Sequence, residues 1–137
     1  MYKTHKAKIV VIGSLYMDIV VETDRIPLIG ETLRKKVILN PAPALDIPKD
    51  IFNYIDYMTP NQTELAYYTG IDDVGEKIET AILKMTNLGV SHVITTLGSD
   101  GSVYLKEGKK VTYQKGYTVP VVDTTGAGDC YNAALAV

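Results

Sequence analysis

The sequence is poor in several features that often identify a function. Among its 137 residues there is no tryptophan, one phenylalanine and one cysteine, and the formal net charge is −2. A single cysteine, Cys130, excludes an intrachain disulfide framework and favours a reducing compartment, so we expect a cytoplasmic protein. Because the charge is nearly balanced and the lysines and arginines are scattered, no nucleic-acid partner is expected.

Long apolar runs are missing as well. No stretch approaches the roughly 18 apolar residues of a membrane span, and the first residues lack the apolar core of a signal peptide. We therefore expect neither a membrane partner nor export. The length predicts a single domain over residues 1–137, because it allows one hydrophobic core and is too short for two.

The common nucleotide-binding fingerprints are also absent. Gly13-Ser14-Leu15 follows a strand-like run but lacks the later glycines of a dinucleotide-binding turn, and no Walker-type Gly-Lys-Ser/Thr occurs downstream. This argues against a dinucleotide-dependent oxidoreductase. An absorbance shift on adding a nicotinamide cofactor would make an oxidoreductase function a candidate again.

The elements that are present alternate as in an α/β protein. β-Branched runs predict strands, and apolar residues at steps of three and four predict a helix at 76–88 that ends at Gly89. The predicted strands are 7–13, 36 to the prolines at 41 and 43, 55–58, 92–97, 102–106 and 109–114. Two short extended pieces, 17–22 and 31–34, predict a small ribbon at the edge of the sheet.

The interval between Gly13 and Lys36 has no helical period. Parallel neighbours in a sheet need a crossover, usually a helix. If the strands on either side of this interval are parallel neighbours, a segment is missing from between them.

The most informative stretch is Asp123-Thr124-Thr125-Gly126-Ala127-Gly128-Asp129, which leads into an alanine-rich run typical of a helix. Gly126 and Gly128 allow a tight turn that leaves N–H groups pointing outward from the helix N-terminus, where an anion such as phosphate is favoured. Asp129 is then a candidate general base that takes a proton from an attacking hydroxyl. Ordinary helix-start chemistry explains the same residues. Cys130, inside the apolar run, is expected to be a buried small residue.

A second motif, Asn61-Gln62-Thr63-Glu64, precedes a helix that Gly70 ends. Asparagine followed three residues later by glutamate is a capping box, in which each side chain bonds the other's backbone N–H. This structural interpretation is sufficient by itself, and it does not exclude a functional one.

The stretch from Asp123 to Asp129 resembles the C-terminal signature of the ribokinase family, the PfkB-type carbohydrate kinases. Further segments resemble this family in the same chain order. They are Gly13-Ser14 with Asp18, Pro27 with Gly30-Glu31-Thr32, Leu39-Asn40-Pro41-Ala42-Pro43-Ala44, Thr59-Pro60-Asn61-Gln62-Thr63-Glu64 and Leu97-Gly98-Ser99-Asp100-Gly101.

The resemblance implies a three-layer α/β/α sandwich with a mostly parallel sheet, here reduced in strand number, and with ligand sites at the carboxyl ends of the strands. It also implies transfer of the γ-phosphoryl of MgATP to a hydroxyl of a small sugar or nucleoside. Asp129 would be the general base, and the N–H groups of Gly126, Ala127 and Gly128 would hold the developing charge.

The other roles implied by the resemblance are binding roles. Asp18 would contact sugar hydroxyls, residues 18–35 would be a remnant of the lid ribbon, and Glu64 would orient Mg²⁺. Tyr16 replaces the asparagine usual in ribokinases, which leaves ribose as the substrate open. The nucleotide would be contacted by Asn40, Asn61, Glu64, Thr96, Gly98, Ser99, Gly101 and Thr125.

The resemblance identifies the chain as a truncated, about half-length member. The Gly-Gly-Lys-Gly-Ala-Asn sugar-binding segment of the family is absent, and so are the helices that follow the signature. The alternative function is therefore a catalytically weak or inactive nucleotide-binding remnant, or an interaction module. Missing strands leave open sheet edges and apolar faces, which predicts a homodimer.

Overall fold

The computed structural model of the chain describes residues 8–14, 17–23, 36–106 and 110–136. Its strands form one seven-stranded sheet in the order in which they occur along the chain. The strands are β1 Lys8–Ser14, β2 Met17–Thr23, β3 Lys36–Asn40, β4 Tyr57–Met58, β5 His92–Thr96, β6 Gly101–Lys106 and β7 Thr112–Lys115. The helices are α1 Gln62–Thr69, α2 Ile78–Asn87, α3 Ala127–Leu135 and the 3-10 helices η1 Lys49–Tyr54 and η2 Gly98–Asp100.

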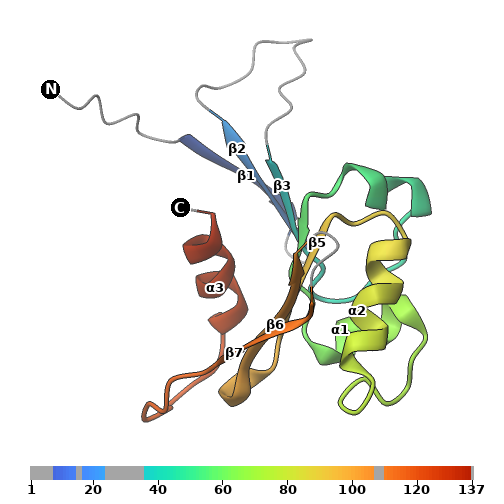
Figure 1. The fold of residues 1–137 in the computed structure, drawn as a ribbon. Coiled ribbons are helices and arrows are strands. Elements are labelled where there is room, and N and C mark those ends of the chain that lie inside the picture. Colours follow the sequence, from blue (N-terminus) through green and yellow to red (C-terminus); the bar gives the residue numbers. More distant parts are fainter. Residues whose placement is uncertain (1–7, 15–16, 24–35, 107–109, 137) are drawn as a thin grey trace, which may run out of the picture.

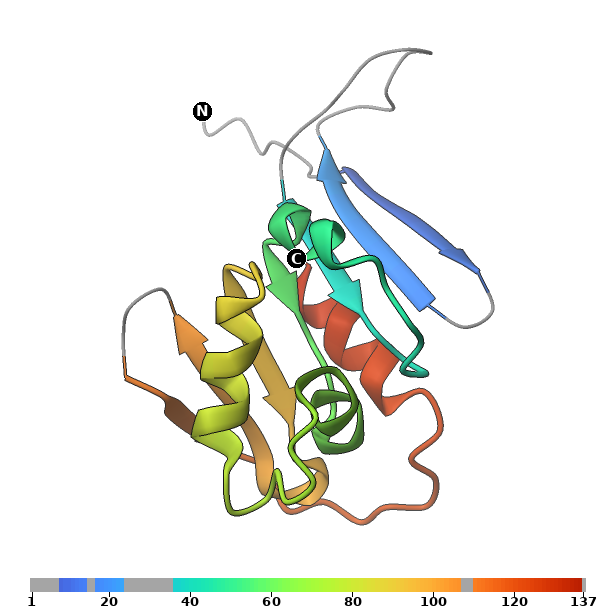
Figure 2. The same ribbon diagram turned by 90° about the vertical axis from the view of Figure 1, so that its right-hand side faces the viewer.

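Helices cover both faces of the sheet. Figure 1 shows α1 and α2 on one face and α3 on the other, and the turned view of Figure 2 agrees. This confirms the predicted three-layer α/β/α arrangement. In the ranges given above, no helix is long and apolar enough to cross a bilayer.

The sheet is mixed. Only β3, β4 and β5 are mutually parallel, while β1, β2, β6 and β7 join their neighbours antiparallel. The antiparallel share is larger than a mostly parallel sheet would have, because the chain turns back directly at both sides of the parallel centre. Polar residues lie at the carboxyl ends of the three parallel strands: Asn40 ends β3, Asn61 follows β4, and Ser99 and Asp100 follow β5.

The expectation of a missing crossover between β1 and β3 is wrong for these strands. β2 lies between them and pairs antiparallel with both, with Asp18 opposite Gly13 on one side and opposite Asn40 on the other. Antiparallel neighbours need only a short connection, so no crossover helix is required. The predicted edge ribbon is wrong for 17–22, which is an inner strand. Its second piece, 31–34, lies outside the described residues, as do Tyr16 and most of the expected lid.

The main core lies between the sheet and the α1–α2 layer. On α2, the stripe predicted from the three- and four-residue spacing is buried, namely Ile78, Ala81, Ile82 and Met85. These side chains pack with buried residues of β3 to β6 and of α1. The other members of this core are Leu39, Phe52, Ile55, Met58, Leu65, Val74, Val90, Val93, Val103, Leu105 and Val111.

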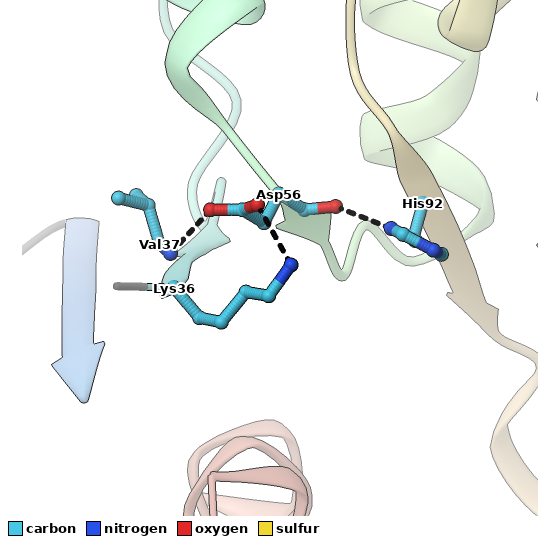
Figure 3. A network of polar contacts seen from close by, with 4 residues as sticks. All are labelled: Lys36, Val37, Asp56 and His92. Carbon is cyan, nitrogen blue, oxygen red and sulfur yellow. Dashed lines mark hydrogen bonds and ion pairs between the residues drawn. The ribbon is translucent and has the colours of Figure 1, made fainter. Parts of the chain in front are cut away.

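A polar network ties the three parallel strands together at their amino ends, as Figure 3 shows. The Asp56 carboxylate accepts from the Val37 backbone N–H at 2.9 Å and from Lys36 Nζ at 3.2 Å. The Asp56 carbonyl oxygen lies 3.0 Å from Nδ1 of His92. The amino ends of the strands lie at the edge of the sheet opposite their carboxyl ends. We therefore interpret the network as structural, holding the three strands in register.

Asp56→Ala should lower the free energy of unfolding by about 1–3 kcal/mol, because the Val37 N–H loses a charged acceptor. Lys36→Ala is the comparison, and it should cost only about 0.2–1 kcal/mol since its side chain is half exposed and solvent screens its ion pair. Urea unfolding of both variants measures the difference. An equal loss would show that the ion pair, and not the backbone hydrogen bond, carries the stabilisation.

Candidate functional site

The carboxyl ends of the parallel strands border a cavity of about 240 Å³. β3 brings Asn40 to it, the residues after β4 bring Thr59 and Asn61, and β5 brings Thr96. The first turn of α3 closes the opposite side. The full lining is Asn40, Ala42, Thr59, Asn61, Glu64, Thr96, Thr124, Gly126, Ala127, Gly128, Asp129 and Asn132.

The N-terminus of α1 forms one wall of this cavity. The predicted capping box is confirmed: Asn61 Oδ1 accepts from the Glu64 N–H at 2.9 Å, and Glu64 Oε2 accepts from the Asn61 N–H at 2.8 Å. The Asn61 amide Nδ2 also donates to Glu64 Oε1 at 2.9 Å. Glu64 is buried, and burial raises its carboxyl pKa although the Asn61 hydrogen bonds oppose the rise.

The turn into α3 forms the opposite wall. Gly126 caps the helix with φ +75°, a left-handed conformation in which glycine is favoured over residues with a side chain. The Ala127 N–H donates to the Thr124 carbonyl at 3.1 Å. Within the described part of the chain, the N–H groups of Gly126, Gly128 and Asp129 have no such acceptor, as is usual at a helix start.

Asp123 stabilises the segment that leads into this turn. Its Oδ1 accepts from the backbone N–H and from the hydroxyl of Thr125, both at 2.8 Å. These bonds lower the pKa of Asp123 and keep it ionised. Thr125 is thus engaged with Asp123 and does not line the cavity.

A second cavity of about 590 Å³ adjoins the first, sharing Thr96, Ala127 and Gly128 with it. It lies between η2, the β6–β7 hairpin and α3, and the predicted residues Gly98 and Gly101 line it. Ser99 is exposed and lines neither cavity. Asp18 lies at the same sheet edge by its register opposite Asn40.

A match to the family model described as pfkB family carbohydrate kinase extends over residues 29–137. The chain belongs to this family. It is 43% identical over 95 residues to a ribokinase from Arabidopsis thaliana, covering 66% of this chain and 24% of the relative. A ribokinase from Haemophilus influenzae is 37% identical over 101 residues, which cover 73% of this chain and 33% of the relative.

The fold is shared with solved pfkB-type kinases. A structure of Arabidopsis thaliana ribokinase complexed with ribose and ATP superposes with a TM-score of 0.64 and 40% identity, over 72% of this chain and 33% of that one. The ribokinase-like α/β fold expected from the sequence is thereby confirmed. The chain spans about a quarter to a third of the length of the relatives that it matches.

Sequence reasoning on this pfkB chain missed four residues of the first cavity, Ala42, Thr59, Thr124 and Asn132. Thr59 and Asn132 are buried, and the Thr59 hydroxyl lies 2.6 Å from Asn132 Oδ1. One signal was available, because Asn132 follows Asp129 by three residues and such positions share a helix face. The expected burial of Cys130 is wrong: Cys130 is exposed, since α3 turns Asn132 toward the sheet.

The pfkB fold implies magnesium, for which the cavity offers carboxylate oxygens. Glu64 and Asp129 are hard oxygen donors on one cavity, which suits this ion. Among the described residues no three His, Cys, Asp or Glu side chains cluster, and Asn61 already bonds both Glu64 oxygens. Glu64 therefore fits Mg²⁺ as one carboxylate ligand if phosphate and water supply the remaining ligands.

Glu64→Gln provides a test of the buried carboxyl. Because burial raises the folded-state pKa of Glu64, the folded protein binds this proton more tightly than the unfolded chain. The resulting stabilisation is present below the unfolded pKa and is lost as the pH rises through the folded pKa. The stability of the wild type relative to Glu64→Gln should therefore fall as the pH rises above the ordinary pKa of glutamate, about 4.3, in urea titrations. A rise would mean that the Asn61 hydrogen bonds outweigh burial.

Proposed function

We propose that the chain is an ATP-dependent phosphotransferase of the sugar-kinase type, which transfers the γ-phosphoryl of MgATP to a hydroxyl of a small sugar or nucleoside. The observation that carries this proposal is the convergence on one cavity of Asp129, Glu64 and the glycine turn that starts α3. A base, a hard oxygen donor and outward N–H groups are the parts that phosphoryl transfer requires.

In this mechanism Asp129 takes the proton from the acceptor hydroxyl. The new bond joins that hydroxyl oxygen to the γ-phosphorus, as the bond from phosphorus to the β–γ bridging oxygen breaks and ADP leaves. The N–H groups of Gly126 and Gly128 stabilise the charge on the transferring phosphoryl, whereas the Ala127 N–H, expected to share this role, donates to the Thr124 carbonyl. Glu64 would hold Mg²⁺, which neutralises phosphate charge when bound.

The two adjoining cavities suit the two parts of the nucleotide. The second cavity has the size of a cofactor site and is lined by Gly98 and Gly101. Gly98, where an added Cβ would meet no atom within 4 Å, admits a ligand close to the backbone. The phosphates would then extend past Thr96 toward Asn40 and Asn61. Ser99 and Thr125 line neither cavity. Any contact that they make with the nucleotide would therefore lie outside the two cavities.

For the acceptor, Asp18 is the residue proposed to bind sugar hydroxyls, because its strand register places it at the edge that holds Asn40. Relatives named ribokinase and a solved ribokinase complex with ribose make a pentose the first acceptor to test. Tyr16, which stands where ribokinases usually have asparagine, is the reason to test other sugars and nucleosides beside it.

A second candidate is a nucleotide-binding protein of the same fold with little or no transfer activity. The observation that favours it is the missing Gly-Gly-Lys-Gly-Ala-Asn segment, which leaves Asp18 as the one proposed sugar contact. Phosphoryl transfer depends mainly on positioning, so a poorly held acceptor would react slowly.

Calorimetric titration with MgATP, followed by an ADP-release assay over a panel of pentoses, hexoses and nucleosides, separates the two candidates. Binding with acceptor-dependent ADP release supports the kinase. Binding without it supports the nucleotide-binding alternative. No binding would contradict both.

Self-association in the cytoplasm is part of the proposal. Large apolar side chains near the α3 turn are exposed, namely Tyr117, Val119, Val121 and Val122. Exposed apolar groups of this kind often mark an interface, and we propose a homodimer. Sedimentation that shows a monomer at micromolar concentration would contradict the homodimer.

A further inference from the structure

The helix that carries Asp129 is attached to the sheet by few contacts. Asn132 is its buried residue, whereas Cys130, Ala133 and Ala134 are exposed. Among the described residues, two side-chain hydrogen bonds join α3 to strands or strand ends. One is the 2.6 Å contact between Thr59 and Asn132, and the other joins Tyr131 to Ser102 at 3.3 Å. The shorter and more deeply buried bond lies at the cavity.

The hydrogen-bonding partners determine how the Asn132 amide is oriented. Its Nδ2 lies 2.9 Å from the Gly128 carbonyl oxygen, which can only accept a hydrogen bond. Its Oδ1 therefore faces the Thr59 hydroxyl, which has one proton to give. That proton goes to Asn132 at 2.6 Å in preference to the Leu39 carbonyl at 3.3 Å. Each polar group of Asn132 thus has one defined partner.

This arrangement links the sheet to the catalytic turn through one side chain. Thr59 directly follows β4, and its hydroxyl donates to Asn132. The Asn132 amide in turn donates to the carbonyl of Gly128, the residue before Asp129. Asn132 and Asp129 share a helix face, and both line the same cavity. A rotation or shift of α3 would therefore move the Asp129 carboxylate relative to the strand ends.

We propose that Thr59 and Asn132 form a positioning pair that fixes the first turn of α3, and with it Asp129, over the carboxyl ends of the parallel strands. The catalytic part of this inference rests on the proposed kinase function. The structural part, which is the fixing of α3 by this hydrogen bond, does not.

Thr59→Val tests the pair, because it removes the hydroxyl and keeps the shape of the side chain. With MgATP and the best acceptor, kcat should fall about 10- to 100-fold while the KM for ATP changes by less than about threefold, since misplacement of the base affects the transition state. In the unliganded protein, amide hydrogen exchange in α3 should quicken about tenfold while exchange in α1 and α2 is unchanged.

Thr69→Val is the matched control. Thr69 is also buried, and its hydroxyl also makes a 2.6 Å hydrogen bond, to the Leu65 carbonyl within α1 and away from the cavity. Its kcat should stay within about twofold of the wild type. Thr59→Ser, which retains the hydroxyl, should restore kcat and α3 exchange to nearly wild-type values.

Asn132→Leu gives a second, independent variant. Combined with Thr59→Val, it should lower kcat little further, because the two residues act as one unit. Unchanged α3 exchange in Thr59→Val would overturn the inference even if kcat fell, since Thr59 would then act by touching the ligand. If the wild type transfers no phosphoryl group, the kinase proposal fails, and the exchange data alone still decide whether the pair fixes α3.

Discussion

Asp129→Ala is expected to lower kcat for phosphoryl transfer on the order of 10³-fold, because the acceptor hydroxyl loses its general base. Nucleotide affinity should remain within about threefold, since the N–H groups of the glycine turn and the second cavity are unchanged. Transfer is measured as acceptor-dependent ADP release, and MgATP binding is measured by calorimetry on the same samples.

Glu79→Ala is the control for the loss of one carboxylate. Glu79 is exposed in the first turn of α2, as Asp129 is in the first turn of α3, but it lies away from both cavities. Its kcat and affinity should match the wild type. If Asp129→Ala lost binding and transfer to the same extent, Asp129 would be a structural residue of the helix start and not the base.

Gly101→Ala should be the most damaging single change to the fold, lowering the free energy of unfolding by more than about 3 kcal/mol. Gly101 has φ +101°, and an added Cβ would collide with the backbone of Gln114 and Gly116. That backbone is the end of β7, so the hairpin that lines the second cavity would have to open. Thermal or urea unfolding measures the loss, and calorimetry shows whether nucleotide binding is lost with it.

Gly98→Ala provides the comparison three residues earlier. Gly98 also has a positive φ, +62°, but an added Cβ would meet no atom within 4 Å. Only the left-handed conformation is penalised, which costs about 1–2 kcal/mol. Similar losses in the two variants would show that conformation alone, and not the collision with β7, requires glycine at position 101.

Features set by nearby residues were predictable from the sequence. The capping box depends on two side chains three residues apart, and the buried stripe of α2 on a repeat within one helix. Asn40 and Asn61 were expected at one edge because each lies at or just beyond the carboxyl end of a strand of the parallel centre. For such features, the strand or helix assignment already determines where the side chains lie.

Features that depend on distant pairing were not predictable in this way. The place of β2 between β1 and β3 depends on its pairing with β3, which aligns Asp18 with Asn40 across residues distant in the chain. The bond between Thr59 and Asn132 joins positions 73 residues apart. The exposure of Cys130 follows from that same bond, since it determines which side of α3 faces the sheet.

The strand order has a consequence for how the protein forms during synthesis. Each strand pairs with its immediate predecessor in the chain, so a nascent polypeptide can extend the sheet one strand at a time as it leaves the ribosome. The cavity at the strand ends is completed later, because α3, which forms one of its walls, follows β7 in the chain and emerges after it. We expect the sheet to be assembled on the ribosome before the polar groups that face this cavity have come together.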